Sequence, residues 1–296
     1  MKTILIAGGT GFIGRKIQTI LENKGYRTAI LSRNPKKENE YYWNPTKKEI
    51  DKNAFKSVNG IINLCGASIG DVRWSANRKK ELLTSRIEPT KFLYSFIDEL
   101  EQLEVYITAS GINCYDFNEV SKTFEEKDAF GSDFLSQLVK EWENTADLFS
   151  SHCRVVKMRT AVVLDRKEGA LSKMSLPIQL GIGSPLGTGK QIISWVHIND
   201  VTNAYIHAIE KPLNGAYNLV GGNETNEIFL KLLAKTLNKP FWFPKVPTFV
   251  LELTLGEMAV IILKGVKASN QKLIESGFEF QFLEVEEAFK NSYQKA

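Results

Sequence analysis

Residues 3–14 read Thr3-Ile-Leu-Ile-Ala-Gly-Gly-Thr-Gly-Phe-Ile-Gly14, and this stretch decides the fold. An apolar run of strand length, residues 3–7, leads into glycines at positions 8, 9, 11 and 14. An amphipathic helical pattern follows, from Phe12 to about Lys24. A strand, a glycine-rich turn and a helix in this order form the unit that places a dinucleotide pyrophosphate on a helix N-terminus. The alternative interpretation is an ordinary tight strand-to-helix turn.

The glycine positions match what such a phosphate site requires. Gly8 permits a tight turn, Gly11 lets backbone N–H groups approach the phosphates, and Gly14 lets the helix pack closely on the strand. The spacing fits both G-x-G-x-x-G, counted from Gly9, and G-x-x-G-x-x-G, counted from Gly8. We therefore expect a bound dinucleotide at the C-terminal end of the first strand.

The end of the second predicted strand, residues 26–32, indicates which dinucleotide. An NAD enzyme places Asp or Glu there, on the adenine ribose hydroxyls. This chain instead has Ser32 and Arg33, with Lys36 and Lys37 beyond and no acidic residue before Glu38. Because Arg binds a 2′-phosphate and an acid repels it, the sequence predicts NADP, as NADPH, rather than NAD. The alternative is a solvated basic loop.

The composition is typical of a globular enzyme-like protein. The chain has 296 residues, of which 43% are hydrophobic and 24% charged, enough for a sizeable core. It has no apolar run of membrane-spanning length, and a strand begins at once, which leaves no room for a signal peptide. The three cysteines are odd in number and widely spaced, which predicts a reducing cytoplasm. With only three histidines, we expect no metal site.

The net charge of +4 is unevenly placed. Residues 1–100 contain 18 Lys and Arg against 10 Asp and Glu, a balance of +8, and the remainder contains 20 against 24, a balance of −4. A basic nucleotide-binding half suits a ligand with three phosphates. No aromatic-and-basic stacking pattern accompanies it, so we expect neither a nucleic-acid nor a membrane partner.

Strand and helix patterns alternate along the chain, as a parallel sheet requires. Further strands are predicted at 60–64, 105–110, 154–159 and 215–219, and helices at about 75–100 (with Pro89 kinking or interrupting it) and 132–149. The expected class is α/β, a doubly wound parallel-sheet domain with a smaller C-terminal module on the substrate side. The expected division is a Rossmann domain over 1–220, with 165–195 inserted toward the substrate, and a helical module over 221–296. Alternation in 277–282 predicts a strand that closes this module.

The chain resembles an atypical extended short-chain dehydrogenase/reductase of the sugar-nucleotide-epimerase-like family. In that family an NAD-dependent epimerase/dehydratase-type domain precedes a C-terminal domain of unknown function. The resemblance extends over nearly the whole length and rests on GGTGFIG (8–14), SRNP (32–35), NLCGASI (63–69), RW (73–74), SRI (85–87), FLSQLVKEWE (134–143), RTAVVL (159–164), LGIGSPLGTGKQ (180–191), SWVHINDV (194–201) and LGEMA (255–259).

The resemblance implies a cofactor site assembled from several segments. The expected cofactor-binding residues are Gly8, Thr10, Gly11, Phe12, Ile13, Gly14, Ser32, Arg33, Cys65, Gly66, Ala67 and Arg86. Ser110 matches the Ser or Thr that polarises a substrate carbonyl or hydroxyl in active relatives. The plainer alternatives are tight packing for residues 65–67, a charged helix face for Arg86 and a strand-end hydroxyl for Ser110.

The catalytic pair of typical relatives, Tyr-x-x-x-Lys, is missing. None of the nine tyrosines has Lys four residues later, and the two positions align near Leu135 and Val139. Tyr115, five residues past Ser110, is the weaker catalytic candidate, with a place at the core rim as the alternative. His197 and Asp200 match a segment that we interpret as scaffold.

Three functions remain open from the sequence. The first is an NADP-dependent oxidoreductase or epimerase-like enzyme acting on a small or nucleotide-linked substrate with an unusual proton donor. The second is a non-catalytic NADP(H)-binding regulator or redox sensor. The third is an interaction protein with an unused pocket, which the presence of Arg33 and of the full glycine set disfavours.

Overall fold

The centre of the molecule is an eight-stranded sheet, seen here in a computed structural model that describes residues 1–294. Its strand order is β11-β8-β6-β5-β1-β2-β3-β4, and every pairing is parallel except that of β3 with β4. The strands are β1 Thr3–Ala7, β2 Arg27–Ser32, β3 Glu40–Asn44, β4 Glu49–Ile50, β5 Val58–Asn63, β6 Val105–Gly111, β8 Arg154–Thr160 and β11 Gly215–Leu219. The α/β class with a parallel central sheet is confirmed.

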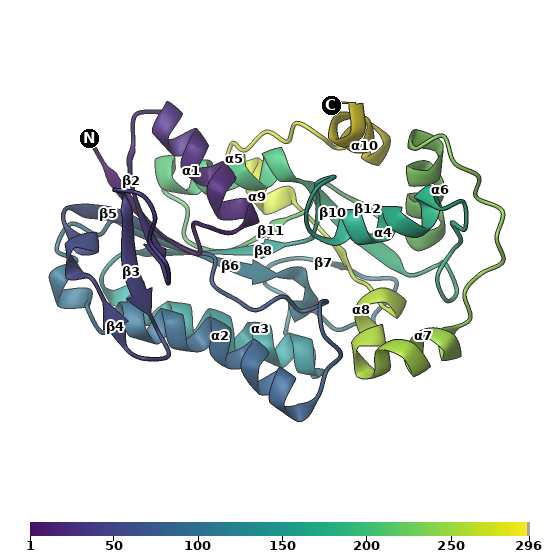
Figure 1. The fold of residues 1–296 in the computed structure, drawn as a ribbon, viewed down its shortest axis with the longest axis horizontal. Coiled ribbons are helices and arrows are strands. Elements are labelled where there is room, and N and C mark those ends of the chain that lie inside the picture. Colours follow the sequence, from purple (N-terminus) through teal and green to yellow (C-terminus); the bar gives the residue numbers. More distant parts are fainter. Residues whose placement is uncertain (295–296) are drawn as a thin grey trace.

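Helices cover both faces of this sheet, as a doubly wound domain requires (Figure 1). One face carries α1 (Phe12–Asn23) and α5 (Ile198–Glu210), which pack on each other. The other carries α2 (Ala76–Tyr94) and α3 (Phe134–Ala146). Helix α2 continues through Pro89, so of the two predicted effects of this proline, a kink or an interruption, the interruption is wrong. Short 3₁₀ turns occupy Lys52–Phe55, Ile97–Glu99, Ile112–Cys114, Asp147–Ser151 and Gly256–Ala259.

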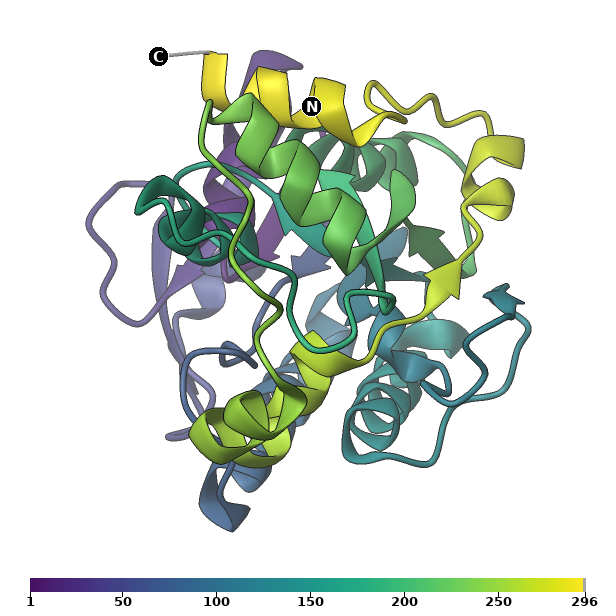
Figure 2. The same cartoon turned by 90° about the vertical axis from the view of Figure 1, so that its right-hand side faces the viewer.

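A smaller body lies beside the C-terminal ends of the strands. It is built around a three-stranded sheet, and its helix α6 lies next to α10, as Figure 2 shows in green and yellow. The strands are β9 Val162–Leu164, β10 Ile192–His197 and β12 Gly222–Thr225, and the helices are α4 Ala170–Gln179, α6 Asn226–Thr236, α7 Thr248–Leu255, α8 Val260–Leu263 and α10 Val285–Gln294. Helix α9 (Gln271–Glu275) packs on β11 of the central sheet. A two-stranded ribbon joins β7 Thr123–Phe124 to β13 Lys267–Ala268. This body combines the inserted segment with the C-terminal part of the chain, while the division at residue 220 stays a prediction.

Two local expectations were not met. No strand was predicted between residues 32 and 60, yet this stretch contains β3 and β4, which extend the sheet at one edge and bury Trp43. Residues 277–282 do not form a strand despite their alternating phenylalanines. Their backbone is bound by a side chain instead, because the N–H groups of Gln281 and Phe282 donate to the carboxylate of Asp200 at 2.7 and 3.2 Å.

Asp200 anchors the C-terminal segment from the first turn of α5. Its side chain is fully buried, and burial raises the pKa of its carboxyl to about 6, against the two hydrogen bonds that lower it. His197, which caps the same helix, lies against the ring of Phe282. The predicted scaffold segment therefore ties α5 to the end of the chain.

The raised pKa of Asp200 makes folding stability depend on pH. The folded state holds this proton more tightly than the unfolded state, so the contribution to stability is full below pH 4 and is lost as pH rises through about 6. Compared with Asp200→Asn, the wild-type protein should therefore lose on the order of 1 kcal/mol of unfolding free energy between pH 5 and 7.5. Urea unfolding at both pH values measures this difference. The exposed Asp98→Asn variant serves as control, and an equal pH dependence in all three proteins would refute the assignment.

Candidate functional site

The glycine turn connects β1 to α1 in a conformation that leaves the helix N-terminus uncapped. Gly8 adopts a positive φ of +82°, and the N–H of Gly11 donates to its carbonyl at 3.0 Å. Gly11 is the N-cap residue and has no side chain to bind the first N–H groups of the helix. A Cβ at Gly14 would lie 2.4 Å from the Gly8 oxygen, so glycine is required there for packing. The exposed end of α1, with the backbone of Phe12 and Ile13, is shaped to receive an anion.

The end of β2 lies beside this turn and carries an uncompensated positive charge. Ser32 is buried, and its hydroxyl accepts the N–H of Asn34 at 3.2 Å, so it shapes the loop. Arg33 is exposed, and its guanidinium has neither an ion pair nor a hydrogen bond with residues 1–294. Its positive charge lowers the pKa of the Cys65 thiol, so Arg33 lies within electrostatic range of the loop after β5.

Cys65, Gly66 and Ala67 begin the loop that follows β5. Burial raises the pKa of the Cys65 thiol to about 12, although the charge of Arg33 lowers it, so this thiol is neutral at pH 7. A Cβ at Gly8 would lie 3.1 Å from the carbonyl carbon of Leu64, so this loop and the glycine turn are in contact. The structure thus brings the three predicted cofactor segments together at one edge of the sheet.

Side chains from other parts of the chain hold the backbone of this loop. Four consecutive carbonyl oxygens, those of residues 67–70, each accept a hydrogen bond from a side chain. The donors are Arg86 to Ala67, Arg78 to Ser68, Trp74 to Ile69 and Lys173 to Gly70. The basic side chains of Arg78, Arg86 and Lys173 therefore stabilise the conformation of this loop.

Arg86 occupies a different position from the one expected of a cofactor ligand. It is buried, stacks on the ring of Trp142 at 5.0 Å, and donates to the carbonyls of Leu82 and Ala67 at 2.8 and 3.0 Å. Burial lowers the pKa of its guanidinium to about 10, which leaves it charged at pH 7. A Cβ at Gly66 would lie 3.0 Å from its central carbon, so Arg86 supports the loop from beneath.

Ser110 ends β6 and belongs to a buried network. Its Oγ donates to Oε1 of Glu143 at 2.6 Å. Arg159 of β8 binds the same carboxylate through two hydrogen bonds, Nε to Oε1 and Nη2 to Oε2, both of 2.8 Å. Burial alone lowers the pKa of Arg159, but its hydrogen bonds and charge interaction with Glu143 raise it above the usual value. The pair is therefore ionised, and it fixes the serine hydroxyl.

Tyr115 lies at the other end of this network and is fully buried. Its hydroxyl donates to Oδ1 of Asn218 at 2.7 Å and accepts from Nη1 of Arg159 at 3.0 Å. Burial raises the pKa of the phenol above its usual value, so it does not ionise near neutral pH. The aligned positions of the missing pair, Leu135 and Val139, are both buried and carry no group that exchanges a proton.

The sequence did not identify Glu143, Arg159 and Asn218 as site residues. A signal was present, because Glu143 stands on the buried face of α3 among Leu138, Val139 and Trp142. Arg159 gave no such signal, because Arg154 and Lys157 stand in the same strand. A charged residue on an apolar helix face indicates a buried charge that needs a partner.

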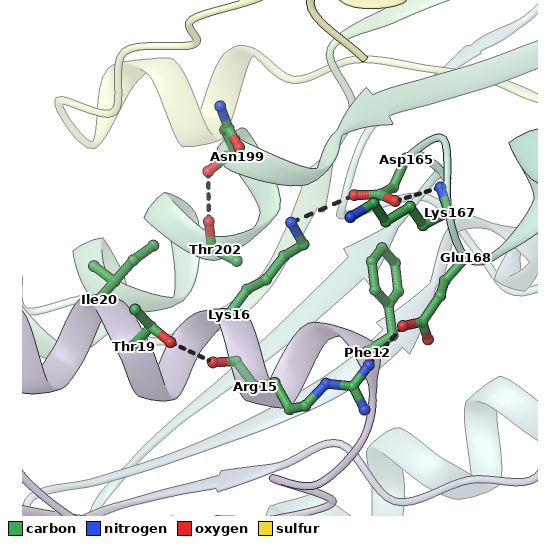
Figure 3. Close-up of a pocket in the computed structure, with 10 residues that line it drawn as sticks. All are labelled: Phe12, Arg15, Lys16, Thr19, Ile20, Asp165, Lys167, Glu168, Asn199 and Thr202. Atoms are coloured by element: carbon green, nitrogen blue, oxygen red, sulfur yellow. Dashed lines mark hydrogen bonds and ion pairs between the residues drawn. The ribbon is translucent and has the colours of Figure 1, made fainter. Parts of the chain in front are cut away.

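A crevice of about 380 Å³ lies beside the glycine turn, between α1, α5 and residues 165–168 (Figure 3). Its cations are mostly paired: Arg15 with Glu168 at 2.5 Å and Lys16 with Asp165 at 3.4 Å. These contacts attach the inserted segment to α1. Gly169, which caps α4, lies near the Phe12 ring.

Residues 1–294 contain no group of three or more His, Cys, Asp or Glu side chains arranged to hold a metal ion. Within the same range no helix is long and apolar enough to cross a membrane.

Comparisons with known proteins agree with this geometry. Residues 4–133 match the NAD dependent epimerase/dehydratase family, and residues 246–292 match a domain of unknown function, DUF1731. Epimerase family protein SDR39U1 of Mus musculus is 33% identical over 295 residues, which cover 97% of this chain and 98% of that protein. Epimerase family protein ML0860 of Mycobacterium leprae is also 33% identical, over 96% of this chain and 94% of its own.

Solved structures give the same result. The crystal structure of human epimerase family protein SDR39U1 with NADPH has a TM-score of 0.90 and 29% identity, and covers 99% of this chain and 100% of that one. A nucleoside-diphosphate sugar epimerase from Corynebacterium glutamicum shares the fold, with a TM-score of 0.81 and 23% identity over 98% of this chain and 58% of that one. The chain belongs to the epimerase family whose members carry a C-terminal DUF1731 domain.

Proposed function

We propose that the chain binds NADP(H) and acts as an epimerase- or oxidoreductase-like protein without the Tyr-x-x-x-Lys pair. The observation that carries the proposal is the exposed, unpaired guanidinium of Arg33, which lies beside the uncapped end of α1. An ionised 2′-phosphate pairs with a guanidinium such as that of Arg33, and a pyrophosphate binds the N–H groups at an uncapped helix N-terminus such as that of α1. The human relative solved with NADPH supports the choice of dinucleotide.

The proposed ligand arrangement follows the order of the strands. The adenosine half lies over β2 with its 2′-phosphate on Arg33, the pyrophosphate lies on the backbone of residues 10–14, and residues 65–67 flank it. The nicotinamide half then lies toward β6 and Ser110. A small or nucleotide-linked substrate enters between this edge and the smaller body, formed by the segment 165–195 and the module 221–296.

A second function, a non-catalytic NADP(H)-binding regulator or redox sensor, is favoured by one specific observation. Both hydroxyls near the proposed nicotinamide position already donate their hydrogens inside the protein, Ser110 to Glu143 and Tyr115 to Asn218. Neither is free to protonate a substrate carbonyl in this arrangement. The catalytic role of Ser110 and the weaker one of Tyr115 stay predictions, which a substrate screen with the NADPH-loaded protein tests.

We also propose a reducing compartment, such as the cytoplasm. Cys65, Cys114 and Cys153 are free thiols, and burial raises the pKa of all three. Thiols of this kind are typical of intracellular proteins.

Arg33→Ala tests the choice between NADPH and NADH. A charge-assisted hydrogen bond is worth about 1.5–3 kcal/mol, so the variant should bind NADPH roughly 10- to 150-fold more weakly. Its affinity for NADH, which has no 2′-phosphate, should change little. Fluorescence titration with both dinucleotides measures the ratio of affinities. Arg27→Ala, at the opposite end of β2 and also exposed, is the matched control.

The result has three readings. An unchanged affinity ratio in Arg33→Ala, with tight NADPH binding, would remove Arg33 from the site. No binding of either dinucleotide by the wild-type protein would overturn the proposed function. The same loss in Arg27→Ala would assign the effect to overall charge.

The glycine turn provides a second test with two distinguishable variants. A Cβ at Gly11 meets only the Gly8 oxygen, at 3.2 Å, so Gly11→Val should fold and yet block the pyrophosphate. A Cβ at Gly14 would collide with the backbone of Gly8 and Gly9, so Gly14→Ala should lower the melting temperature. Thermal denaturation and NADPH titration separate the two effects. A folded Gly11→Val protein that binds NADPH normally would contradict the proposed phosphate position.

A further inference from the structure

The hydroxyl of Ser110 has a fixed direction, because its partner can only accept. Glu143 is a carboxylate that receives two hydrogen bonds from Arg159, and it has no hydrogen to give. The 2.6 Å contact between Ser110 Oγ and Glu143 Oε1 is therefore a donation from the serine. A serine hydroxyl has one hydrogen, so nothing remains for Ser110 to donate to a ligand.

The remainder of the network keeps this arrangement in place. Nη1 of Arg159 donates to the Tyr115 hydroxyl at 3.0 Å and to the carbonyl of Glu126 at 3.1 Å, so the guanidinium is held on several sides. Both members of the ion pair are buried, with side-chain exposures of 4% for Arg159 and 3% for Glu143. Turning the hydroxyl toward a ligand would leave Oε1 of Glu143 with Nε of Arg159 as its remaining donor, and the loss of a hydrogen bond to a buried carboxylate is costly.

What Ser110 still offers is an acceptor. Its oxygen receives no hydrogen bond from residues 1–294, and the residue is 6% exposed at the C-terminal end of β6. Strands β2, β1, β5 and β6 are neighbours in that order. A dinucleotide whose adenosine lies over β2 and whose phosphates lie on the β1 turn extends toward the end of β6 with its nicotinamide half.

We propose that Ser110 accepts a hydrogen bond from the carboxamide amino group of the nicotinamide, and that Glu143 and Arg159 are the positioning residues that make it an acceptor. This inference rests on the proposed NADP(H) binding. It gives Ser110 the role opposite to the carbonyl-polarising donor of related enzymes. A ligand group with only lone pairs at this point would face the lone pairs of the serine oxygen and would be disfavoured.

An NADP⁺ analogue that changes one group tests the proposal. In the 3-acetylpyridine analogue a methyl group replaces the carboxamide amino group, so the hydrogen-bond donor is lost at similar size. The wild-type protein should bind NADP⁺ about 3- to 10-fold more tightly than the analogue, as measured by calorimetric titration. In Ser110→Ala this preference should fall to about 1, because the loss affects NADP⁺ alone.

Two further variants separate the hydroxyl from general effects on folding. Ser110→Cys has nearly the same shape as the wild type and only a weak hydrogen-bond acceptor, so it should also lose most of the preference for NADP⁺. This variant replaces Ser110→Ala in the test if the alanine variant folds poorly. Ser194→Ala removes another buried serine hydroxyl, one that binds Val266 in the smaller body, and should keep the preference. Equal wild-type affinity for both compounds, or an equal loss for both in Ser110→Ala, would overturn the inference and leave the proposed function intact. If the wild-type protein binds neither compound nor NADPH, both fail.

Discussion

The ion pair between Glu143 and Arg159 is the interaction on which the candidate site depends. It joins α3 to β8 inside the molecule, and its hydrogen bonds extend to Ser110 on one side and to Tyr115 on the other. Removing one member of such a pair leaves an uncompensated buried charge, which commonly costs about 3–5 kcal/mol. At this edge of the sheet, the ion pair therefore contacts the hydroxyls of Ser110 and Tyr115, and both hydroxyls already donate their hydrogens to groups of the protein. This arrangement differs from that of a typical dehydrogenase, in which a tyrosine and a lysine face the ligand.

The loop after β5 shows a second use of charge in positioning. Its backbone carbonyls are bound by Arg78, Arg86 and Lys173, so Arg86, which the sequence predicted as a cofactor ligand, binds the protein itself together with two other cations. Arg33 is the contrast, because it lies at the same edge and its guanidinium has no ion pair or hydrogen bond with residues 1–294. In the function proposed above, this guanidinium binds the ligand, whereas the cations of the loop bind the protein.

The fold could be predicted from the sequence to a large extent, because the signals were local. The run of residues 3–7 and the glycines after it gave β1 and the start of α1 correctly, and alternation of strands and helices gave the parallel sheet. Residues 277–282 show the limit of this method. Their alternation is genuine, but the partner of their backbone is a carboxylate 81 and 82 residues earlier, and no local pattern reports such a contact. The strands β3 and β4 were missed because they are only five and two residues long, too short to show a pattern.

Sequence alone indicates a candidate site only where the type of a residue limits its use. The glycines predict a phosphate turn because they permit a backbone shape, Arg33 predicts an anion ligand because it is charged, and both roles stay predictions. The direction of the Ser110 hydrogen bond depends on Glu143 and Arg159, which are 33 and 49 positions away, and so only the three-dimensional structure shows it.

The inserted segment is fastened to the rest of the protein by ion pairs that solvent can reach. Arg15 with Glu168 and Lys16 with Asp165 hold its beginning, and Lys173 with Asp71 attaches its helix to the loop after β5. Dissolved ions weaken exposed pairs of this kind, and they leave buried pairs such as Glu143–Arg159 nearly unaffected. The salt concentration therefore changes how firmly the inserted segment is attached to the rest of the protein. It leaves the hydrogen bonds around Glu143 and Arg159 unchanged.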